Sequence, residues 1–187
     1  MSDELIDAFV KKYASLSGVA HVAEGADAVA PIVVSVLREV GCKRVVFAEL
    51  PDGLDDAIER ACVDAGIDVH RSPFDSSELP HAIDAAEVGV SWAVFAVAES
   101  GSLVEFALDD AVRLVSTLPR VHIGIFKAST LLENLRDAAE PLRQFYLDHP
   151  KNATATFISG PSRTADIEMR LTLGVHGPEV AHAIVIK

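Results

Sequence analysis

Strand-like and helix-like segments alternate along these 187 residues and predict an α/β fold, a sandwich of layers around a mostly parallel sheet. Three observations support this prediction. Runs such as KRVVFAE at residues 43–49 have a continuous apolar centre, which is typical of parallel strands covered on both faces. Amphipathic segments with helical spacing separate these runs, as right-handed crossover connections require. Half of the residues are hydrophobic, enough for one core, so we expect a single domain over residues 1–187.

The first half of the chain begins with a helix and then alternates strand and helix. Apolar residues at helical spacing between Leu5 and Leu16 predict that the first helix packs one face against the body. Gly41 and Gly66 each end a predicted helix and precede a predicted strand. The elements expected here are a helix at residues 3–16, an extended piece at 19–22, a helix at 26–40, a strand at 43–49, a helix at 54–65, a strand at 67–70 and a helix at 76–86.

The stretch VGVSWAVFAVAESGSLVEF, residues 88–106, is the centre of the predicted sheet. It is nearly uncharged, and β-branched and aromatic residues fill it on both sides of a turn. That turn contains Glu99, Ser100, Gly101 and Ser102, in which the glycine supplies backbone freedom. Glu99 is therefore expected at the end of a central strand.

The second half continues the alternation. The elements expected here are a helix at residues 109–117, a strand at 121–126, a long helix at 128–147 that bends near Pro141, a strand at 153–159, a short helix at 165–171 and a strand at 181–186. Ligands of open α/β sheets bind beyond strand ends. We therefore expect the chemistry of this protein at three loops, residues 99–102, 160–164 and 174–178.

The charge balance excludes several kinds of partner. Asp and Glu number 28 against 16 Lys and Arg, and this net charge of −12 argues against nucleic acid or an anionic membrane surface. No apolar run reaches the length of a membrane span and the N-terminus lacks a signal-peptide pattern, so a cytoplasmic location is expected. The acidic composition also resembles that of proteins from salt-loving microbes, a hypothesis that a melting temperature rising in molar KCl would support.

Cys42 and Cys62 are the only cysteines, twenty positions apart. This number and spacing argue against a thiolate metal site, an iron–sulfur cluster or a disulfide framework. We expect two reduced, partly buried thiols.

Glu99 is the candidate catalytic residue. It follows five apolar residues, so its carboxylate is expected at a strand end or in a cleft, where it would suit a nucleophile, a base or a hydrogen-bond acceptor. The neighbouring Ser100, Gly101 and Ser102 are candidate ligand-binding residues. The alternative is that Glu99 accepts backbone N–H groups within a turn.

The segment SGPSRTADIE, residues 159–168, places hydroxyls and a guanidinium just before a predicted helix. Free N–H groups, the helix dipole and Arg163 would bind a carboxylate or phosphate, together with Gly160, Ser162 and Thr164. The alternative is a capped helix, in which Ser162 or Thr164 bonds the first turn and Arg163 pairs with an acid of that turn.

Two histidines and one further arginine stand in distinctive settings. His122 lies inside a predicted strand, where a core hydrogen bond is the usual role. His176 lies in a glycine-rich loop, where it would contact a ligand or stabilise the turn. Arg113 would bind a ligand or neutralise Asp109 and Asp110 nearby. No spacing of His or carboxylate residues indicates a metal, and no cofactor is expected.

Four motifs follow one another in the second half: AESGSLV at residues 98–104, RLVSTLPRVHI at 113–123, ISGPSRTADIE at 158–168 and LGVHGP at 173–178. In order and spacing they closely resemble the LUD-domain family of lactate-utilisation proteins. The close match covers residues 88–187, whereas the first half agrees in its order of helices and strands. The resemblance implies a three-layer α/β sandwich with a mostly parallel sheet, the fold called NagB/RpiA/CoA-transferase-like.

Within this family the chain looks most like the LutC (YkgG) type, a LUD domain without cluster-binding cysteines. Such proteins accompany two iron–sulfur subunits that oxidise L-lactate to pyruvate. The resemblance therefore implies a non-cluster accessory subunit, or a domain that binds a small anion, beside iron–sulfur partners. The family often has threonines where Ser100 and Ser102 stand, and this difference keeps the hydroxyls.

Two other functions stay open. One is a CoA-transferase-like or sugar-phosphate-binding enzyme that uses Glu99, with Arg163 holding the anion. This hypothesis rests on analogy at the level of the fold. The other is a structural scaffold whose loops are simple turns.

Overall fold

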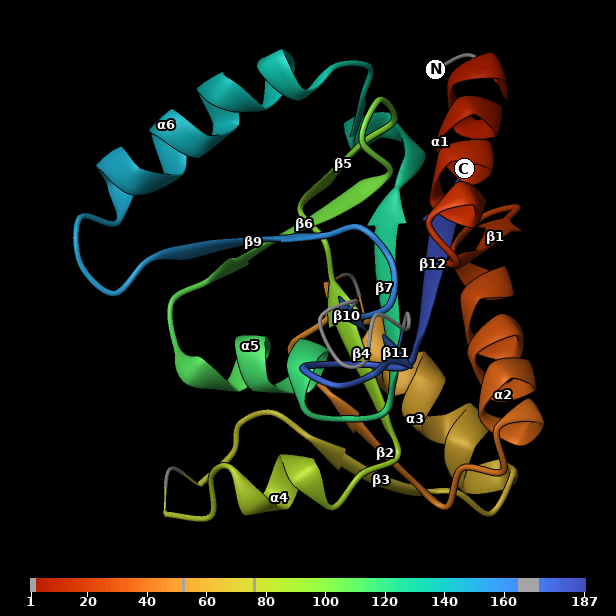
Figure 1. Cartoon of the computed structure of the whole chain (residues 1–187). Coiled ribbons are helices and arrows are strands. Elements are labelled where there is room, and N and C mark those ends of the chain that lie inside the picture. Colours follow the sequence, from red (N-terminus) through yellow and green to blue (C-terminus); the bar gives the residue numbers. More distant parts are fainter. Residues whose placement is uncertain (1–2, 52, 76, 165–171) are drawn as a thin grey trace.

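The computed structural model describes residues 3–51, 53–75, 77–164 and 172–187. Its centre is a six-stranded sheet in the order β1-β12-β7-β4-β2-β3, and all neighbouring strands in it are parallel (Figure 1). The strands are β1 (Val19–Ala23), β2 (Arg44–Phe47), β3 (Asp68–Arg71), β4 (Val88–Trp92), β7 (Val121–Lys127) and β12 (Val180–Ile186). The mostly parallel sheet expected from the sequence is confirmed.

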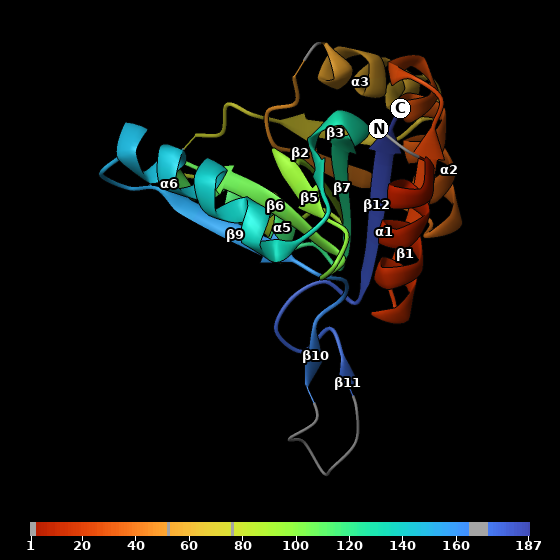
Figure 2. The same cartoon turned by 90° about the horizontal axis from the view of Figure 1, so that it is seen from above.

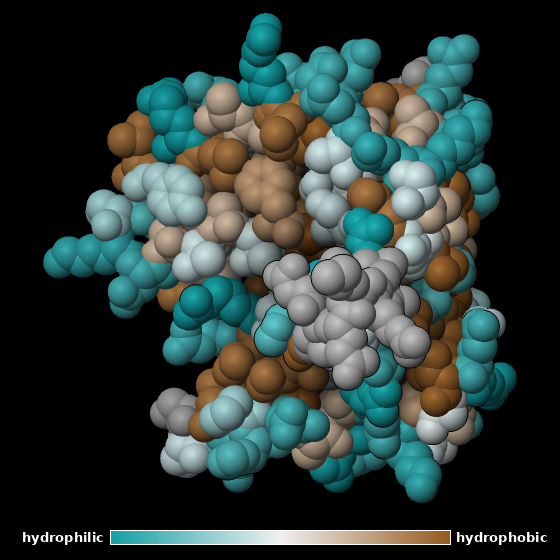
Figure 3. Space-filling model, in the orientation of Figure 1, coloured by the Kyte–Doolittle hydropathy of each residue, from teal (hydrophilic) through white to brown (hydrophobic). Residues whose placement is uncertain are grey.

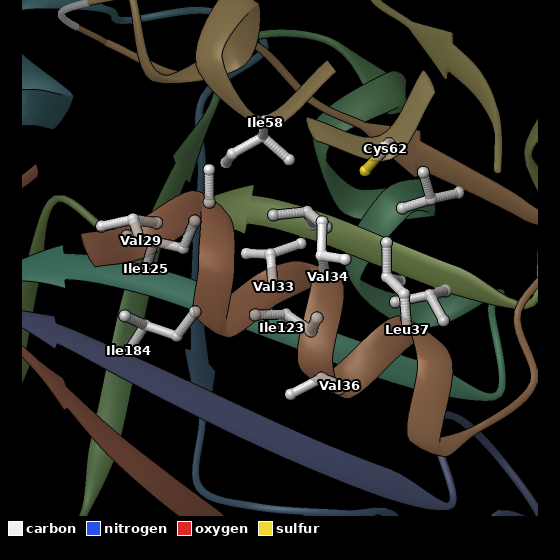
Figure 4. Packing of buried hydrophobic residues seen from close by; sticks show 14 of the residues in the cluster. Val29, Val33, Val34, Val36, Leu37, Ile58, Cys62, Ile123, Ile125 and Ile184 are labelled. Atoms are coloured by element: carbon white, nitrogen blue, oxygen red, sulfur yellow. The ribbon is translucent and has the colours of Figure 1, made fainter. Parts of the chain in front are cut away.

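Helices cover one face of this sheet. They are α2 (Val29–Glu39), which follows the short 3₁₀ helix η1 (Ala26–Ala28), and α3 (Leu54–Asp64). Figure 4 shows how Val33 and Ile58 of the helices lie against Ile123, Ile125 and Ile184 of the strands. All five side chains are fully buried. Burying each contributes about 1.5–3 kcal/mol, so this face is a main source of stability.

The other face carries a mixed layer. It contains α1 (Asp3–Ser15), α5 (Asp110–Thr117) and a second sheet in the order β8-β5-β6-β9 (Figure 2). That sheet consists of β5 (Phe95–Val97), β6 (Ser102–Ala107), β8 (Leu131–Leu132) and β9 (Thr154–Ile158). Phe9 of α1 packs edge-on against Phe126 of β7, with ring centroids 5.1 Å apart. A Cβ on Gly89 would collide with the carbonyl oxygen of Val115, so the α5 backbone lies directly on β4. The three-layer sandwich is therefore present, with a small sheet in its third layer.

The outer face of the second sheet is covered by α6 (Ala139–Asp148). Phe145 of this helix stacks on Phe106 of β6, with ring centroids 3.9 Å apart and planes 10° apart. Apolar side chains gather between α6 and β9 in Figure 3, and Phe157 of β9 remains 41% exposed. The cover of this sheet is therefore partial.

The central stretch of residues 88–106 divides between the two sheets, which the sequence did not predict. The backbone N–H of Ala93 still donates to Ile125 O in the first sheet, whereas that of Val94 donates to Val104 O in the second. Glu99 consequently lies in the β5–β6 turn rather than at the carboxyl end of a strand of the parallel sheet. The residues on both sides of the switch are apolar, so periodicity alone does not reveal it.

The long helix expected over residues 128–147 is wrong. Its first part is broken into the 3₁₀ helix η2 (Ala128–Thr130), β8 and the 3₁₀ helix η3 (Leu135–Ala138), and only α6 is a regular helix. Strand pairing of Leu131 with Ala96 explains the difference, since an extended segment there completes the second sheet. Asn134 then caps η3 through a capping box with Asp137. Pro141 lies in the first turn of α6, where no N–H is needed, so it starts the helix instead of bending it.

Of two further predicted helices, one is shorter than expected and the other lies outside the described residues. The helix expected at residues 76–86 is reduced to α4 (His81–Asp84), which begins directly after Pro80. The helix expected at residues 165–171 lies outside the described residues. Within the described ranges, none of the helices combines the length and the apolar character that a membrane span needs.

Cys42 and Cys62 are both buried and unpaired, as the sequence predicted. Burial raises the pKa of the Cys42 thiol to about 12 and that of Cys62 to about 11, so thiolate is scarce at neutral pH. We expect a colourimetric disulfide reagent at neutral pH to leave both thiols of the native protein unmodified and to titrate both in denaturant. Rapid modification of the native protein would contradict this burial.

Candidate functional site

The three predicted loops form one connected cluster beside the C-terminal end of α1. We call residues 100–102, 159–162 and 174–178 the loop cluster. The Oγ atoms of Ser100 and Ser102 lie 2.7 Å apart, and those of Ser102 and Ser159 also lie 2.7 Å apart. This chain of hydroxyls joins the β5–β6 turn to the segment after β9.

The end of α1 packs closely on two glycines of the loop cluster. Gly160 has φ 105°, and a Cβ there would lie 2.8 Å from the carbonyl oxygen of Leu16. Gly101 has φ 63°, and a Cβ there would lie 2.9 Å from Cγ of Lys12. Both positions therefore need glycine, for their backbone conformation and for the approach of α1.

Ser162 connects the two later loops. Its backbone N–H donates to Pro178 O at 2.9 Å, and its carbonyl accepts from Gly174 N at 3.0 Å. Its Oγ accepts from the backbone N–H of His176 at 3.3 Å. The His176 side chain is exposed. Ser162 thus stabilises the loop, while the imidazole of His176 stays available to a ligand.

Arg163 and Thr164 lie in an extended strand. They form β10 (Arg163–Thr164), which pairs antiparallel with β11 (Thr172–Leu173), and these two strands project from the body (Figure 2). The helix whose dipole was expected to contribute, at residues 165–171, lies outside the described residues, so that contribution stays a prediction. Arg163 remains an exposed guanidinium without an ion pair among the described residues.

Glu99 forms its hydrogen bonds with residues outside the hydroxyl chain. Its Oε2 accepts the backbone N–H of Leu135 at 2.7 Å, and its own N–H donates to Glu133 O at 3.0 Å. It lines a cavity of about 520 Å³ together with Glu4 and Glu133. Three carboxylates at one cavity repel an anion, so this geometry favours the alternative role of Glu99 as an acceptor that stabilises the turn.

Arg113 lies apart from the loop cluster, on α5. Its guanidinium forms an ion pair with Asp110, as one of the two roles considered for it predicted. Asp109 instead caps α5, where its Oδ1 accepts from Ala111 N at 2.9 Å. Arg113 also lines two large cavities.

A buried polar cluster lies between the two sheets, and the sequence did not predict it. Ser91 of β4, Glu105 of β6 and His122 of β7 are all at most 1% exposed. Ser91 Oγ bonds Glu105 Oε1 and lies 2.7 Å from His122 Nε2, and the same Nε2 lies 3.5 Å from Glu105 Oε1. The core hydrogen bond expected for His122 is present. Each residue stands alone in its own strand, so no local spacing marks the cluster.

Two atoms of this cluster have no partner. Glu105 Oε2 and His122 Nδ1 are buried without a hydrogen bond among the described residues. A Ser-His-Glu set resembles the groups of a nucleophilic triad. However, Ser91 is 0% exposed, so no substrate reaches its hydroxyl in this conformation. The arrangement is that of a buried polar network that links the sheets.

A pair of histidines lies near the edge of the first sheet. His21 Nε2 of β1 and His182 Nδ1 of β12 are 3.0 Å apart, and the rings stack at 5.3 Å. Burial, then His21 and His122 nearby, lowers the pKa of His182 to about 4. At neutral pH His182 is therefore uncharged. Within the ranges that the structure describes, no three His, Cys, Asp or Glu side chains are arranged to hold a metal ion.

Comparison with known proteins agrees with this architecture. A crystal structure of a DUF162 family protein from Deinococcus radiodurans at 1.70 Å matches the whole chain with a TM-score of 0.69, covering 99% of that chain at 19% identity. This likeness concerns the fold alone.

Curated relatives are more similar in sequence. Lactate utilization protein C of Geobacillus sp. (strain WCH70) is 37% identical over 138 residues, which cover 72% of this chain and 56% of that protein. Lactate utilization protein C of Shouchella clausii (strain KSM-K16) is 40% identical over 112 residues, which cover 60% of this chain and 49% of that protein. The chain thus spans about half the length of these relatives. The LUD domain model matches residues 6–186. The chain belongs to the LUD-domain family.

Proposed function

We propose that this chain serves the oxidation of L-lactate to pyruvate as a LutC-like protein that carries no cluster and acts beside iron–sulfur partners. The observation that carries the proposal is the LUD domain over residues 6–186, combined with relatives named Lactate utilization protein C. Electron transfer in this proposal belongs to the partners, and all components are placed in the cytoplasm.

The two cysteines support this division of labour. Both are buried in the apolar core between α2, α3 and the sheet, and their raised pKa values keep them protonated. Protonated, buried thiols are poor ligands for iron. In this proposal any cluster used in the reaction belongs to the partners and not to Cys42 or Cys62.

The enzyme hypothesis with Glu99 as nucleophile receives less support. An acyl-accepting carboxylate has to approach an anionic substrate, whereas Glu99 shares its cavity with Glu4 and Glu133. The Leu135 N–H also occupies its Oε2 at 2.7 Å. The anion-binding role proposed for the loop cluster rests instead on His176 and the serine hydroxyls, with Arg163 directly after the cluster in the chain. A purely structural scaffold remains the third hypothesis.

Deleting the gene in its host tests the proposal. We expect growth on L-lactate as sole carbon source to stop, growth on pyruvate to continue, and plasmid-borne protein to restore lactate growth. Tagged protein should co-purify with subunits that contain iron. Normal lactate growth of the deletion strain would overturn the proposal.

Complementation with Glu99→Gln separates the accessory role from the enzyme role. A Gln oxygen still accepts the Leu135 N–H but cannot form an acyl intermediate. We expect full restoration of lactate growth by this variant. A stable Glu99→Gln protein that fails to restore growth would favour the nucleophile instead.

A further inference from the structure

Two large cavities lie on both sides of Arg113, away from the loop cluster. Two cavities of about 720 and 770 Å³ share Leu79, Asp110, Arg113 and Thr154 in their walls. They are therefore two lobes of one cleft between α5, β9 and the segment that follows β3. We call it the Arg113 cleft. Its first lobe begins at Ser72, directly after the carboxyl end of β3, where ligands of parallel sheets bind.

Arg113 is positioned to receive an anion. Among the described residues that line the two lobes, it is the one cationic side chain. Its ion pair with Asp110 is open to solvent, since the two side chains are 44% and 70% exposed. An exposed pair of this kind contributes little free energy, so a phosphate able to form several charge-assisted hydrogen bonds can replace Asp110.

Two hydroxyls and an acceptor share the walls of the cleft with Arg113. Thr154 and Thr156 of β9 line the second lobe, and neither hydroxyl has a hydrogen bond among the described residues. Asp109 lines the first lobe and uses Oδ1 for the cap of α5, which leaves Oδ2 as an acceptor. The hydroxyls suit phosphate oxygens, and the carboxylate suits the hydroxyls of a sugar.

The opposite wall of the first lobe is apolar. Phe74 lines it and is stacked on His70, with ring centroids 5.2 Å apart and planes 2° apart. Leu79 extends this wall, and apolar surface lies between α5 and α4 in Figure 3. A fixed aromatic ring beside aliphatic side chains suits a flat ring system.

We propose that the Arg113 cleft binds a phosphate ester of nucleotide size, with its phosphate at Arg113, its sugar hydroxyls at Asp109 and its flat base against Phe74. The volume favours this class over lactate, because a three-carbon acid would fill only a small part of either lobe and would not touch Phe74 and Thr154 together. The site is independent of the proposed role in lactate utilisation.

Titration calorimetry with AMP tests the proposal. The contributions of phosphate, sugar and base are separated by titrating ribose 5-phosphate, adenosine and inorganic phosphate, and L-lactate is titrated for comparison. We expect AMP to bind more tightly than each of the others. Arg113→Gln should weaken AMP by about tenfold or more, which is the loss of charge-assisted hydrogen bonds. Phe74→Leu should weaken AMP but leave ribose 5-phosphate unchanged.

The matched control is Arg143→Gln on α6. Arg143 forms an ion pair with Glu140 at the same spacing as Arg113 and Asp110, but it lies outside both lobes. We expect this variant to bind AMP like the parent. Absence of AMP binding by the folded parent, or equal binding by Arg113→Gln, would overturn the proposal, whereas the growth test of lactate utilisation would be unaffected.

Discussion

Replacing His122 by Leu is expected to lower the free energy of unfolding by about 3 kcal/mol. The substitution roughly keeps the side-chain volume, but it leaves the Glu105 carboxylate buried with the Ser91 hydroxyl as its single polar neighbour. Removing one partner of a buried polar set costs up to about 3 kcal/mol, because the remaining polar group stays desolvated without its hydrogen bond. Urea denaturation, with the slope of the transition checked for constancy, measures this loss.

A second substitution tests whether the cluster is the cause. The double variant His122→Leu with Glu105→Leu should recover most of the lost stability, because the carboxyl group that lost its histidine partner is then replaced by an apolar side chain. Ile123→Val is the matched control in the same strand. It should cost about 1 kcal/mol, with no recovery on adding Glu105→Leu. Additive losses in the His122 pair would show that Glu105 and His122 are not coupled.

Acidification from about pH 7 to pH 5 is expected to lower the free energy of unfolding by about 2 kcal/mol, and by about 3 kcal/mol at pH 4, through His182. The pKa of this histidine is about 4 in the folded protein against an ordinary value of 6.5. Between these values the unfolded chain binds more protons than the folded protein. Stability is therefore complete above pH 6.5 and is lost as the pH falls.

The groups around His182 also affect the histidine pKa values on which this pH dependence rests. His21 and His122 lower the pKa of His182 after burial, the largest cause. Burial also lowers the pKa of His21, while Glu39 acts in the opposite direction. His182→Asn keeps an acceptor close to the position of Nδ1, so it should remove most of the slope between pH 7 and pH 5. The exposed His81→Asn should keep the slope, and an unchanged slope in His182→Asn would contradict this assignment.

The sequence allowed us to predict which loops lie together at the candidate site. It did not allow us to predict how their side chains are arranged. Glycine, serine and histidine patterns located the segments that meet beside α1, since turn residues have local signatures. The direction of Glu99 towards Leu135 depends on the path of residues 128–138, which the leucine spacing there predicted wrongly. A helix and a short strand are both compatible with that spacing. The segment is a strand because Leu131 pairs with Ala96 in the second sheet.

The sequence by itself determined the layered α/β fold, the parallel strands and the family. These properties depend on residue types and short periodicities, which record the faces that each segment buries. The tertiary structure alone decided that residues 88–106 serve two sheets, that Ser91, Glu105 and His122 meet, and that Arg113 lines a cleft. Such contacts join residues that are distant in the chain, and local sequence carries no record of which strands become neighbours.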